Sequence, residues 1–258
     1  MILIDAEKIK SAFEECGVSS GDTVFLHCDA FFLAQISGSS TLEKMDFFFN
    51  VLDQLLGEHG TLILPTFTYS FTKSEEFNLE QTPSSVGLLT EYFRKREGVK
   101  RSKDPNFSIA CSGRHREQII NAPTHDTFGP DSIFGILYSQ NSHIICLGCS
   151  FDRITYTHYV EEVLNVDYRY FKEFSGQIVD QSTNKEVKVH YFVRDTSFDT
   201  SVNLGLLKNI LEEKSLLKKS TIGRASLFSV RAKDFFEEAR VLLMQNKYGL
   251  IGAGKLSL

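Results

Sequence analysis

The 258-residue sequence predicts an α/β fold, in which short buried strands alternate with amphipathic helices in a layered domain. Short apolar runs bounded by turns are typical of buried strands, whereas apolar residues at every third or fourth position are typical of helices. Hydrophobic residues make up 42% of the chain and charged residues 24%, as in ordinary soluble globular proteins. No internal repeat, low-complexity tract or linker divides the chain, so we expect residues 1–258 to form a single domain.

Capping and turn residues separate the elements predicted in the first hundred residues. Asp5 is a suitable N-cap and Gly17 a stop signal for the first helix, and Pro65 ends the second strand. The predicted elements are a helix over 5–16, a strand over 23–27, a helix over 42–56, a strand over 61–64 and a helix over 86–96. The core face of the helix over 42–56 would consist of Leu42, Met45, Phe49, Leu52 and Leu56.

The second part of the chain continues the alternation and adds a predicted hairpin. Residues 168–174 alternate with period two, which favours a strand, and a hairpin is expected around Ser182-Thr183-Asn184. The stretch over 216–230 shows no clear period. The other predicted elements are strands over 109–111, 144–147, 176–180 and 187–194 and helices over 114–120, 203–214 and 232–245.

Residues 155–162, T-Y-T-H-Y-V-E-E, carry the most specific chemical signal. On a helix, spacings of three residues bring Thr155, His158 and Glu161 onto one face. On a strand, His158 and Glu161 would lie on opposite faces, and we favour the helix. A neutral imidazole beside a carboxylate is a proton acceptor, because the carboxylate fixes the tautomer and stabilises the imidazolium that forms. A surface histidine next to an acid by chance is the alternative.

Charge and cysteine content restrict the class of protein. The net charge of −5 argues against a nucleic-acid binder that relies on a basic surface. Five cysteines, an odd number, fit a reducing cytoplasm, and for the C-x-x-C of Cys146 and Cys149 we favour packing at a strand end over a zinc or redox role. The N-terminus lacks a signal-peptide plan and no apolar run approaches about 18 residues, so we expect a cytoplasmic protein without membrane insertion.

Three polar or aromatic segments are candidate binding loops. The segments 27–29 and 66–68 follow strands, and their backbone amides could face an anion, with two capped loops that bind nothing as the alternative. Asp104, before Pro105, would present its carboxylate from a stiff turn, to a cationic amine or a histidine, or merely serve as a turn acid. Tyr168, Tyr170 and Lys172 on one side of a strand suit a nucleotide or sugar ring with phosphates, with plain sheet packing as the alternative.

Five short motifs, in this order along the chain, resemble those of the aminoglycoside 3-N-acetyltransferase family, also called antibiotic N-acetyltransferases. They are G-D-T-V-F-L-H (21–27), G-T-L-I-L-P-T-F-T (60–68), R-S-K-D-P-N-F-S (101–108), F-G-P-D-S (128–132) and L-G-C-S-F-D-R-I-T-Y-T-H-Y-V-E (147–161). The resemblance implies a three-layer α/β/α domain around a mixed β-sheet and an acyl-CoA donor, such as acetyl-CoA. It also implies a His–Glu arrangement that deprotonates an amino-sugar amine, and these roles fall on His158 and Glu161.

Two departures from the family pattern determine which acceptor we expect. Aspartate stands at Asp104-Pro105 where drug-modifying members usually have His-Pro, and Cys28-Asp29-Ala30-Phe31-Phe32 replaces a Ser-rich segment. Together with residues 168–172, Y-R-Y-F-K, these departures resemble the branch that acylates nucleotide-linked amino sugars for surface polysaccharides. We therefore expect a dTDP- or UDP-linked amino sugar as acceptor, with an aminoglycoside as the alternative.

The chemistry of acyl transfer assigns a role to each candidate residue. An ammonium group cannot attack a thioester until it loses a proton, for which His158, polarised by Glu161, is the proposed base. The amides of the loop over 29–32 would stabilise the oxyanion, and direct attack needs no enzyme nucleophile, although an acyl-Cys28 route is an alternative. The expected donor-binding residues are Cys28, Asp29, Ala30, Phe31, Phe32, Thr66, Thr68, Ser102 and Ser108; the expected acceptor-binding residues are Asp104, Thr155, Tyr168, Tyr170 and Lys172.

Two other classes of function remain open at this point. A metal-dependent hydrolase could use His27, Asp104, His158 and Glu161 as ligands, but the H-x-x-E pattern lacks the second histidine of familiar zinc helices, and we expect no metal. A non-catalytic sugar-binding module would tolerate the loss of His158. The expected partners are an amino-sugar acceptor and an acyl-CoA, without nucleic acid, and a homo-oligomer is not excluded.

Overall fold

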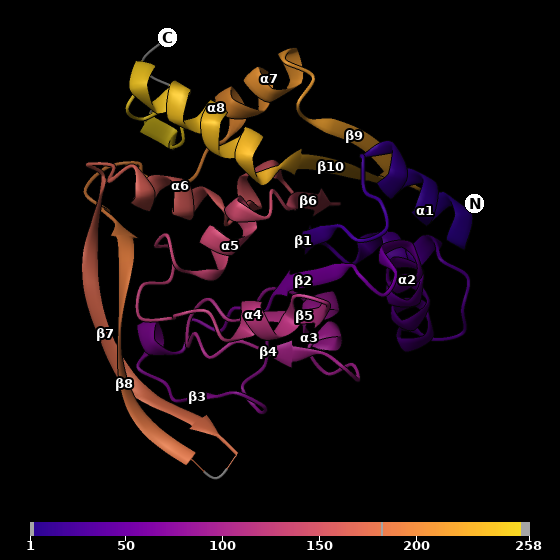
Figure 1. Ribbon diagram of the computed structural model, residues 1–258, viewed down its shortest axis with the longest axis horizontal. Coiled ribbons are helices and arrows are strands. Elements are labelled where there is room, and N and C mark those ends of the chain that lie inside the picture. Colours follow the sequence, from indigo (N-terminus) through magenta and orange to yellow (C-terminus); the bar gives the residue numbers. More distant parts are fainter. Residues whose placement is uncertain (1–2, 182, 254–258) are drawn as a thin grey trace.

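A mixed seven-stranded sheet forms the centre of the protein (Figure 1). The computed structural model describes residues 3–181 and 183–253. The strand order is β4 (Lys100–Arg101), β5 (Ile109–Gly113), β2 (Thr61–Pro65), β1 (Thr23–Cys28), β6 (His143–Leu147), β10 (Ala225–Arg231) and β9 (Lys218–Ile222). The three central strands β2, β1 and β6 are parallel, and the strands on both sides pair antiparallel. The carboxyl ends of the parallel strands meet at one edge, where α/β proteins place their ligands.

Helices cover both faces of this sheet, which confirms the expected three-layer α/β/α fold. Alternate residues of β1 supply the two cores: Phe25 packs with one cluster, and Val24 and Leu26 pack with the other. One face is covered by α1 (Ala6–Glu15), α2 (Thr41–Leu56) and α3 (Leu88–Phe93). The other face is covered by α4 (Arg116–Ile120), α5 (Ile133–Ser139), α6 (Thr157–Val163), α7 (Gly205–Glu213) and α8 (Ala232–Gln245).

A second, three-stranded sheet lies beside the main domain and was not expected. It consists of β3 (Phe77–Asn78), β7 (Arg169–Asp180) and β8 (Thr183–Arg194), and β7 and β8 form one long antiparallel hairpin (Figure 1). The sequence predicted two shorter strands in place of β7 and a turn around residues 182–184, of which Ser182 lies outside the described residues. Phe107 packs against the cores of both the main domain and this sheet, and so connects them.

Local signals predicted most element boundaries to within a few residues. Asp5 caps α1 as expected, because its Oδ1 accepts the amide of Lys8 at 2.9 Å. Leu42 was assigned to the core face of α2, and this was wrong: its side chain is 60% exposed, because it lies in the first turn on the side that faces solvent. The helix predicted over 86–96 is limited to α3, and the unassigned stretch over 216–230 forms the antiparallel pair β9 and β10.

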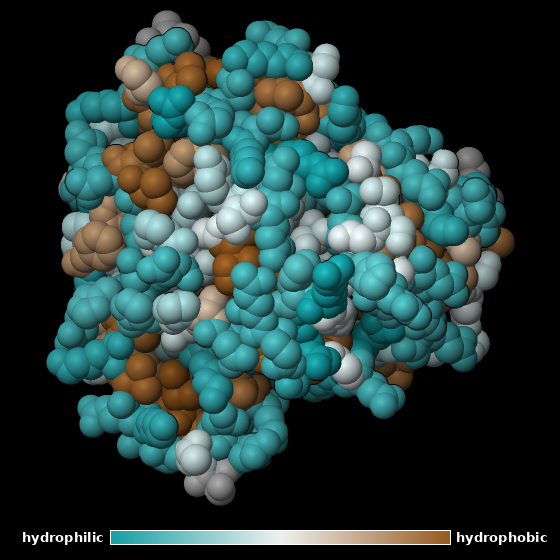
Figure 2. Space-filling model, viewed as in Figure 1, coloured by the Kyte–Doolittle hydropathy of each residue, from teal (hydrophilic) through white to brown (hydrophobic). Residues whose placement is uncertain are grey.

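The surface is mostly polar, and hydrophobic side chains appear on it in separate patches (Figure 2). Within residues 3–181 and 183–253, every helix is too short or too polar to cross a lipid bilayer. Short 3₁₀ turns lie in the connections between elements: η1 (Phe31–Gln35), η2 (Phe71–Lys73) and η3 (Phe151–Arg153). Two of them, η1 and η3, follow β1 and β6 at the carboxyl edge of the sheet.

Candidate active site

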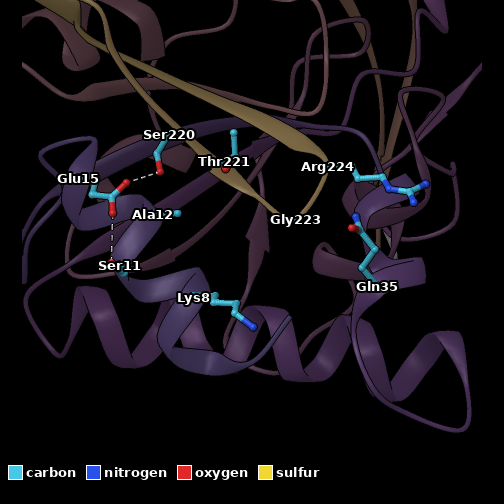
Figure 3. Close-up of a pocket in the computed structure, with 9 residues that line it drawn as sticks. All are labelled: Lys8, Ser11, Ala12, Glu15, Gln35, Ser220, Thr221, Gly223 and Arg224. Carbon is cyan, nitrogen blue, oxygen red and sulfur yellow. Dashed lines mark hydrogen bonds between the residues drawn. The ribbon is translucent and has the colours of Figure 1, made fainter. Parts of the chain in front are cut away.

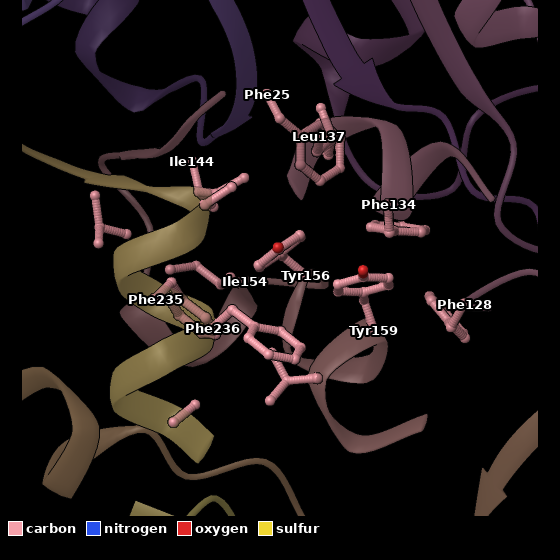
Figure 4. Packing of buried hydrophobic residues seen from close by; sticks show 14 of the residues in the cluster. Phe25, Phe128, Phe134, Leu137, Ile144, Ile154, Tyr156, Tyr159, Phe235 and Phe236 are labelled. Atoms are coloured by element: carbon pink, nitrogen blue, oxygen red, sulfur yellow. The ribbon is translucent and has the colours of Figure 1, made fainter. Parts of the chain in front are cut away.

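Helix α6 carries His158 and is held in place by an aromatic core. The ring of Tyr156 lies 5.6 Å from that of Phe235, and the ring of Tyr159 lies 5.8 Å from that of Phe236, both on α8 (Figure 4). These rings fix the rotation of α6 about its axis, because aromatic pairs prefer specific offset geometries. The predicted helix is therefore confirmed, although it begins at Thr157, so that Thr155 lies just before it.

His158, Glu161 and Arg169 form a connected network. Glu161 Oε2 lies 2.7 Å from His158 Nδ1 and 2.7 Å from Nε of Arg169, the first residue of β7. Nδ1 also lies 3.0 Å from Nη2 of Arg169, which can only donate. Because the ionised carboxylate can only accept and lies closer to Nδ1, we assign the proton to Nδ1, where it is donated to Glu161, and the lone pair to Nε2. Nε2 has no hydrogen-bond partner among the described residues. The His158 side chain is 20% exposed and that of Glu161 is fully buried, so only the imidazole is accessible to a substrate.

The network tunes the protonation of both groups. Burial lowers the pKa of His158 below its usual value, and the positive charge of Arg169 lowers it further, whereas Glu161 opposes both effects. Burial acts to raise the pKa of Glu161, but Arg169 and His158 outweigh it, so this pKa is lowered overall. At neutral pH, His158 is therefore neutral and Glu161 is ionised, which is the state that a general base requires.

A cavity of about 530 Å³ lies at the carboxyl ends of β1, β2 and β6. Thr155 lines it, whereas His158, one turn later, is not among its lining residues. His27 Nε2 accepts the amide of Thr155 at 3.3 Å and so fixes the start of α6 against β1. The residues that line the cavity are His27, Cys28, Asp29, Pro65, Phe67, Tyr69, Ser85, Val86, Gly87, Thr90, Cys149, Arg153 and Thr155.

A row of aromatic rings connects this cavity to His158. Phe67, in the cavity wall, lies 5.2 Å from Phe107 between ring centroids, and Phe107 lies 4.9 Å from Phe128. The ring of Phe128 lies 5.2 Å from the imidazole of His158. The sequence motif F-G-P-D-S thus supplies the ring that packs directly against the proposed base.

The expected donor-binding loop lies in part at the cavity. Cys28 and Asp29 line it, whereas Phe32 is buried in the core behind it. Two of the four amides in the loop are already engaged: Asp29 N donates to Leu147 O at 2.9 Å, and Phe31 N donates to the Asp29 carboxylate at 3.2 Å. Ala30 and Phe32 are thus the remaining candidates for oxyanion contacts in this loop.

Thr66, Thr68, Ser102 and Ser108 do not line the cavity, contrary to expectation. All four are buried, and three of their hydroxyls donate to backbone carbonyls of the segments 66–70 and 102–109. The fourth, that of Ser102, accepts the amide of Ile109 at 3.0 Å. These hydroxyls join two loops to each other, because a buried hydroxyl needs a partner.

Asp104 is also buried, and its carboxylate binds neighbouring groups of the protein. Its Oδ1 accepts the amides of Asn106 and Phe107 and the hydroxyl of Tyr191, and its Oδ2 accepts the hydroxyl of Thr127. Both oxygens are therefore occupied, and the turn-acid alternative fits better than amine binding. Its contact with Tyr191 ties the loop before β5 to β8.

Of the three aromatic and basic residues expected at the acceptor, Tyr170 and Lys172 are exposed on β7, whereas Tyr168 is not accessible. Tyr168 precedes β7 and is buried, and the charge of Glu161 contributes, after burial, to raising its pKa. Tyr170 is half-exposed on β7. Lys172 lies with Nζ 5.1 Å from the ring of Phe174. The functional residue that sequence analysis missed is Arg169, whose contact with Glu161 depends on how the hairpin packs beside α6.

The ligand set of the alternative hydrolase is divided among separate contacts. His27 bonds Thr155, His158 bonds Glu161, and Asp104 bonds Tyr191. In the part of the chain that the structure describes, no three His, Cys, Asp or Glu side chains come together as metal ligands. A second cavity, of about 430 Å³, lies between α1 and the β9–β10 turn and contains none of the expected site residues (Figure 3).

Comparisons with known proteins extend this assignment. The family model for aminoglycoside 3-N-acetyltransferases matches residues 25–244. The chain is 25% identical over 178 residues to the SPbeta prophage-derived aminoglycoside N(3′)-acetyltransferase-like protein YokD of Bacillus subtilis (strain 168), a match that covers 60% of this chain and 64% of that protein. It is 28% identical over 187 residues to aminoglycoside N(3)-acetyltransferase IV of a Salmonella species, covering 71% of this chain and 68% of that one.

The fold is shared with solved enzymes. A structure of AAC-IIIb in a binary complex with CoASH superposes with a TM-score of 0.79 at 17% identity, covering 94% of this chain and 97% of that one. Separately, the family match confirms the expected enzyme class, a CoA-dependent N-acyltransferase, and the expected donor, acetyl-CoA, at the level of the family.

The expected acceptor was wrong. The matching family and both relatives are named for aminoglycosides, which overturns the assignment to the branch that acylates nucleotide-linked amino sugars. The two departures that suggested this branch lie at Asp104, whose carboxylate supports a loop, and in the loop over 28–32, which is partly buried. Because the family model matches residues 25–244, which is most of the sequence, the chain belongs to the aminoglycoside 3-N-acetyltransferase family.

Proposed function

We propose that this chain, as a single domain, transfers the acetyl group of acetyl-CoA to the 3-amine of an aminoglycoside. The observation that carries the proposal is the hydrogen bond between His158 Nδ1 and the buried Glu161, which leaves Nε2 available as a base. The match to the aminoglycoside 3-N-acetyltransferase family supports the donor and the class of acceptor.

The geometry supports direct transfer without an acyl-enzyme. Nε2 of His158 takes a proton from the acceptor ammonium, and the resulting amine attacks the thioester carbonyl carbon. The C–N bond forms as the carbonyl oxygen becomes anionic, and the C–S bond then breaks and releases the CoA thiolate. A thiolate leaves without strong acid assistance because its pKa is about 8.5. While His158 holds the proton, the negative charge of Glu161 stabilises the imidazolium.

The cavity at the carboxyl edge of the sheet is the proposed position of the donor's thioester end. Cys28 and Asp29 line it, and the amides of Ala30 and Phe32 are the oxyanion donors that the loop still offers. Asp29 also places a carboxylate at the cavity, which suits a polycationic acceptor. Lys172 has the wrong sign for such an acceptor, because like charges repel, so we propose no contact for it.

A substrate panel tests the function directly. Release of free CoA thiol should be observed with acetyl-CoA and aminoglycosides that have a free 3-amine, and should be absent with the same compounds acylated at that amine. His158→Asn should lower kcat by about 10²–10⁴-fold, because asparagine keeps a polar side chain but cannot accept the proton. His59→Asn, at an exposed histidine after α2, is the matched control and should not change the rate.

Two outcomes would overturn the proposal. One is turnover in His158→Asn equal to that of the unaltered protein. The other is the absence of thiol release with every aminoglycoside, measured on protein whose cooperative thermal unfolding shows that it is folded.

A further inference from the structure

Three cysteine thiols converge on the carboxyl edge of the sheet. Cys28, at the end of β1, and Cys149, two residues after β6, both line the cavity of about 530 Å³. Cys146 lies within β6 opposite His27 and is fully buried. All three are free thiols. Cys28 lines the proposed donor site, but direct transfer requires no enzyme nucleophile and gives none of the three thiols a chemical role.

The chain reverses direction between Cys146 and Cys149. Gly148 has a φ of +70°, a conformation that favours glycine, and a Cβ at this position would lie 2.9 Å from the ring of Phe31. The turn returns Cys149 to the sheet, where its sulfur lies 3.5 Å from the carbonyl oxygen of His27. The Cys146 thiol donates to the carbonyl oxygen of Ser150, with 3.8 Å between sulfur and oxygen. The C-x-x-C turn thus holds both thiols at the same strand end.

The two thiols of this pair differ in exposure and in acidity. Cys149 is half-buried at the cavity, whereas Cys146 lies behind it. The neighbouring thiol of Cys146 lowers the pKa of Cys149, although burial and Asp29 oppose this, whereas Cys149 and burial raise the pKa of Cys146. Burial likewise raises the pKa of Cys28. A thiolate is the attacking species in disulfide exchange, so Cys149 is the reactive member of the cluster.

We propose that Cys149 forms a mixed disulfide with oxidised CoA in this cavity and that Cys146 resolves it. The inference depends on the proposed function in one respect, which is that the cavity accepts the thiol end of the coenzyme. It concerns a covalent modification of the protein and does not require the acetyl-transfer reaction to take place.

The exchange balances with CoA disulfide as the oxidant. The Cys149 thiolate attacks one sulfur of CoA disulfide, so that the S–S bond of the disulfide breaks, a Cys149–CoA bond forms and one CoA thiolate leaves. The sulfur of Cys146 then attacks the sulfur of Cys149, the bond between Cys149 and CoA breaks, and the proton of Cys146 passes to the departing CoA thiolate, which leaves a Cys146–Cys149 disulfide. The protein dithiol is oxidised by two electrons, and CoA disulfide is reduced to two CoA.

The first intermediate occupies the proposed donor site. A CoA moiety attached to Cys149 fills the cavity in which acetyl-CoA would bind, so transfer should stop until a thiol reductant restores the dithiol. Under this mechanism the ratio of CoA disulfide to CoA controls the enzyme.

Intact mass spectrometry under non-reducing conditions tests this proposal. Folded protein is incubated with CoA disulfide, or with oxidised glutathione as a disulfide that lacks the nucleotide. In the unaltered protein, the expected products are a transient CoA adduct and then the Cys146–Cys149 disulfide, identified by peptide mapping. The reaction with CoA disulfide should be faster than that with oxidised glutathione by about tenfold or more, because CoA also binds the cavity.

Single cysteine variants separate the two roles. Cys146→Ser should accumulate the CoA adduct, and Cys146→Ala should do the same if the serine variant folds poorly, because both lack the resolving thiol. Cys149→Ser should form no adduct. Cys16→Ser, at a buried cysteine after α1, is the control and should react like the unaltered protein.

An adduct that persists in Cys149→Ser, or equal rates with CoA disulfide and oxidised glutathione, would overturn the proposal. Adduct formation without turnover of any aminoglycoside would contradict the proposed function and leave this inference standing. Normal turnover without adduct formation would contradict only this inference.

Discussion

Arg169 and Glu161 form a buried ion pair in which the guanidinium Nε lies 2.7 Å from the carboxylate Oε2. The same oxygen accepts the hydrogen bond from His158, and Nη2 of Arg169 lies 3.0 Å from Nδ1 of the imidazole, so the arginine acts on the base both directly and through the acid. The pair connects the long hairpin to α6 and thus couples the second sheet to the proposed catalytic residue. Arg169 contacts no reacting atom in this arrangement and is a positioning residue.

The activity should depend on pH through His158. Since only the neutral imidazole accepts a proton, kcat/KM should rise with pH through the pKa of His158, which lies below its usual value of about 6.5. Arg169→Gln removes the positive charge that lowers this pKa, so the acid limb of the profile should move to higher pH. Arg194→Gln should produce a smaller shift in the same direction, because Arg194 is the weakest of the contributions to this pKa. An unchanged acid limb in Arg169→Gln would contradict the assigned base.

Breaking the buried ion pair should destabilise the protein. In Glu161→Gln the guanidinium of Arg169, whose side chain is 6% exposed, loses its carboxylate partner, and such losses typically cost about 3–5 kcal/mol. The free energy of unfolding in urea measures the effect. The double variant Glu161→Gln with Arg169→Gln should lose less than the sum of the two single variants, because it leaves no unpaired charge. Additive losses would show that the two side chains do not interact.

The folded protein should lose stability in mild acid. Burial lowers the pKa values of His27 and His143 to about 4, and that of His158 is also lowered, so these groups stay neutral in the folded state. The unfolded chain binds protons on them below about pH 6.5, where the folded state does not. The contribution of these neutral histidines to the free energy of unfolding is therefore complete above about pH 6.5 and decreases as the pH falls towards about 4. Urea unfolding midpoints across this range should fall, and His143→Gln should reduce the slope.

Glu162 should have the opposite dependence. Burial and Asp126 raise the pKa of Glu162 to about 9, so the folded state retains a proton that the unfolded chain releases near pH 4.5. Its contribution to stability is complete below about pH 4.5 and is lost as the pH rises to about 9. Glu162→Gln mimics the protonated form and should flatten the decline in unfolding free energy between pH 7 and pH 9. A decline as steep as that of the unaltered protein would contradict the raised pKa.

Arg101 should be a major determinant of stability despite its distance from the proposed chemistry. Its buried guanidinium donates to the carbonyl oxygens of Leu79, Thr82 and Thr66. Arg101→Met leaves these acceptors unsatisfied and should cost about 3 kcal/mol or more, measured by urea unfolding. Lys100→Met, next to it in β4 but exposed and paired with Glu117 at the surface, should produce no measurable change.

Local patterns were sufficient for the elements that have a single strong period. The helix over 155–162 was recognised because its i,i+3 spacing gives His158 and Glu161 a common face, and α8 has the predicted bounds of residues 232–245. The pattern failed for β7, because a half-exposed hairpin with Tyr170 outside and Phe174 partly buried lacks one clear apolar face. It also placed Leu42 in the core, because periodicity alone does not fix the rotation of a first turn.

The sequence by itself determined the layered fold, the His158–Glu161 pair and the order of the motifs, because these depend on spacing within a few residues or on the order of segments along the chain. Only the tertiary structure decided which polar residues face the cavity. The hydroxyls of Thr66, Thr68 and Ser108 bind the backbone of another loop, about 40 residues away along the chain. Arg169, on β7, binds Glu161, on α6. Such contacts depend on how whole elements pack, and a sequence pattern records the period of an element but not its partner.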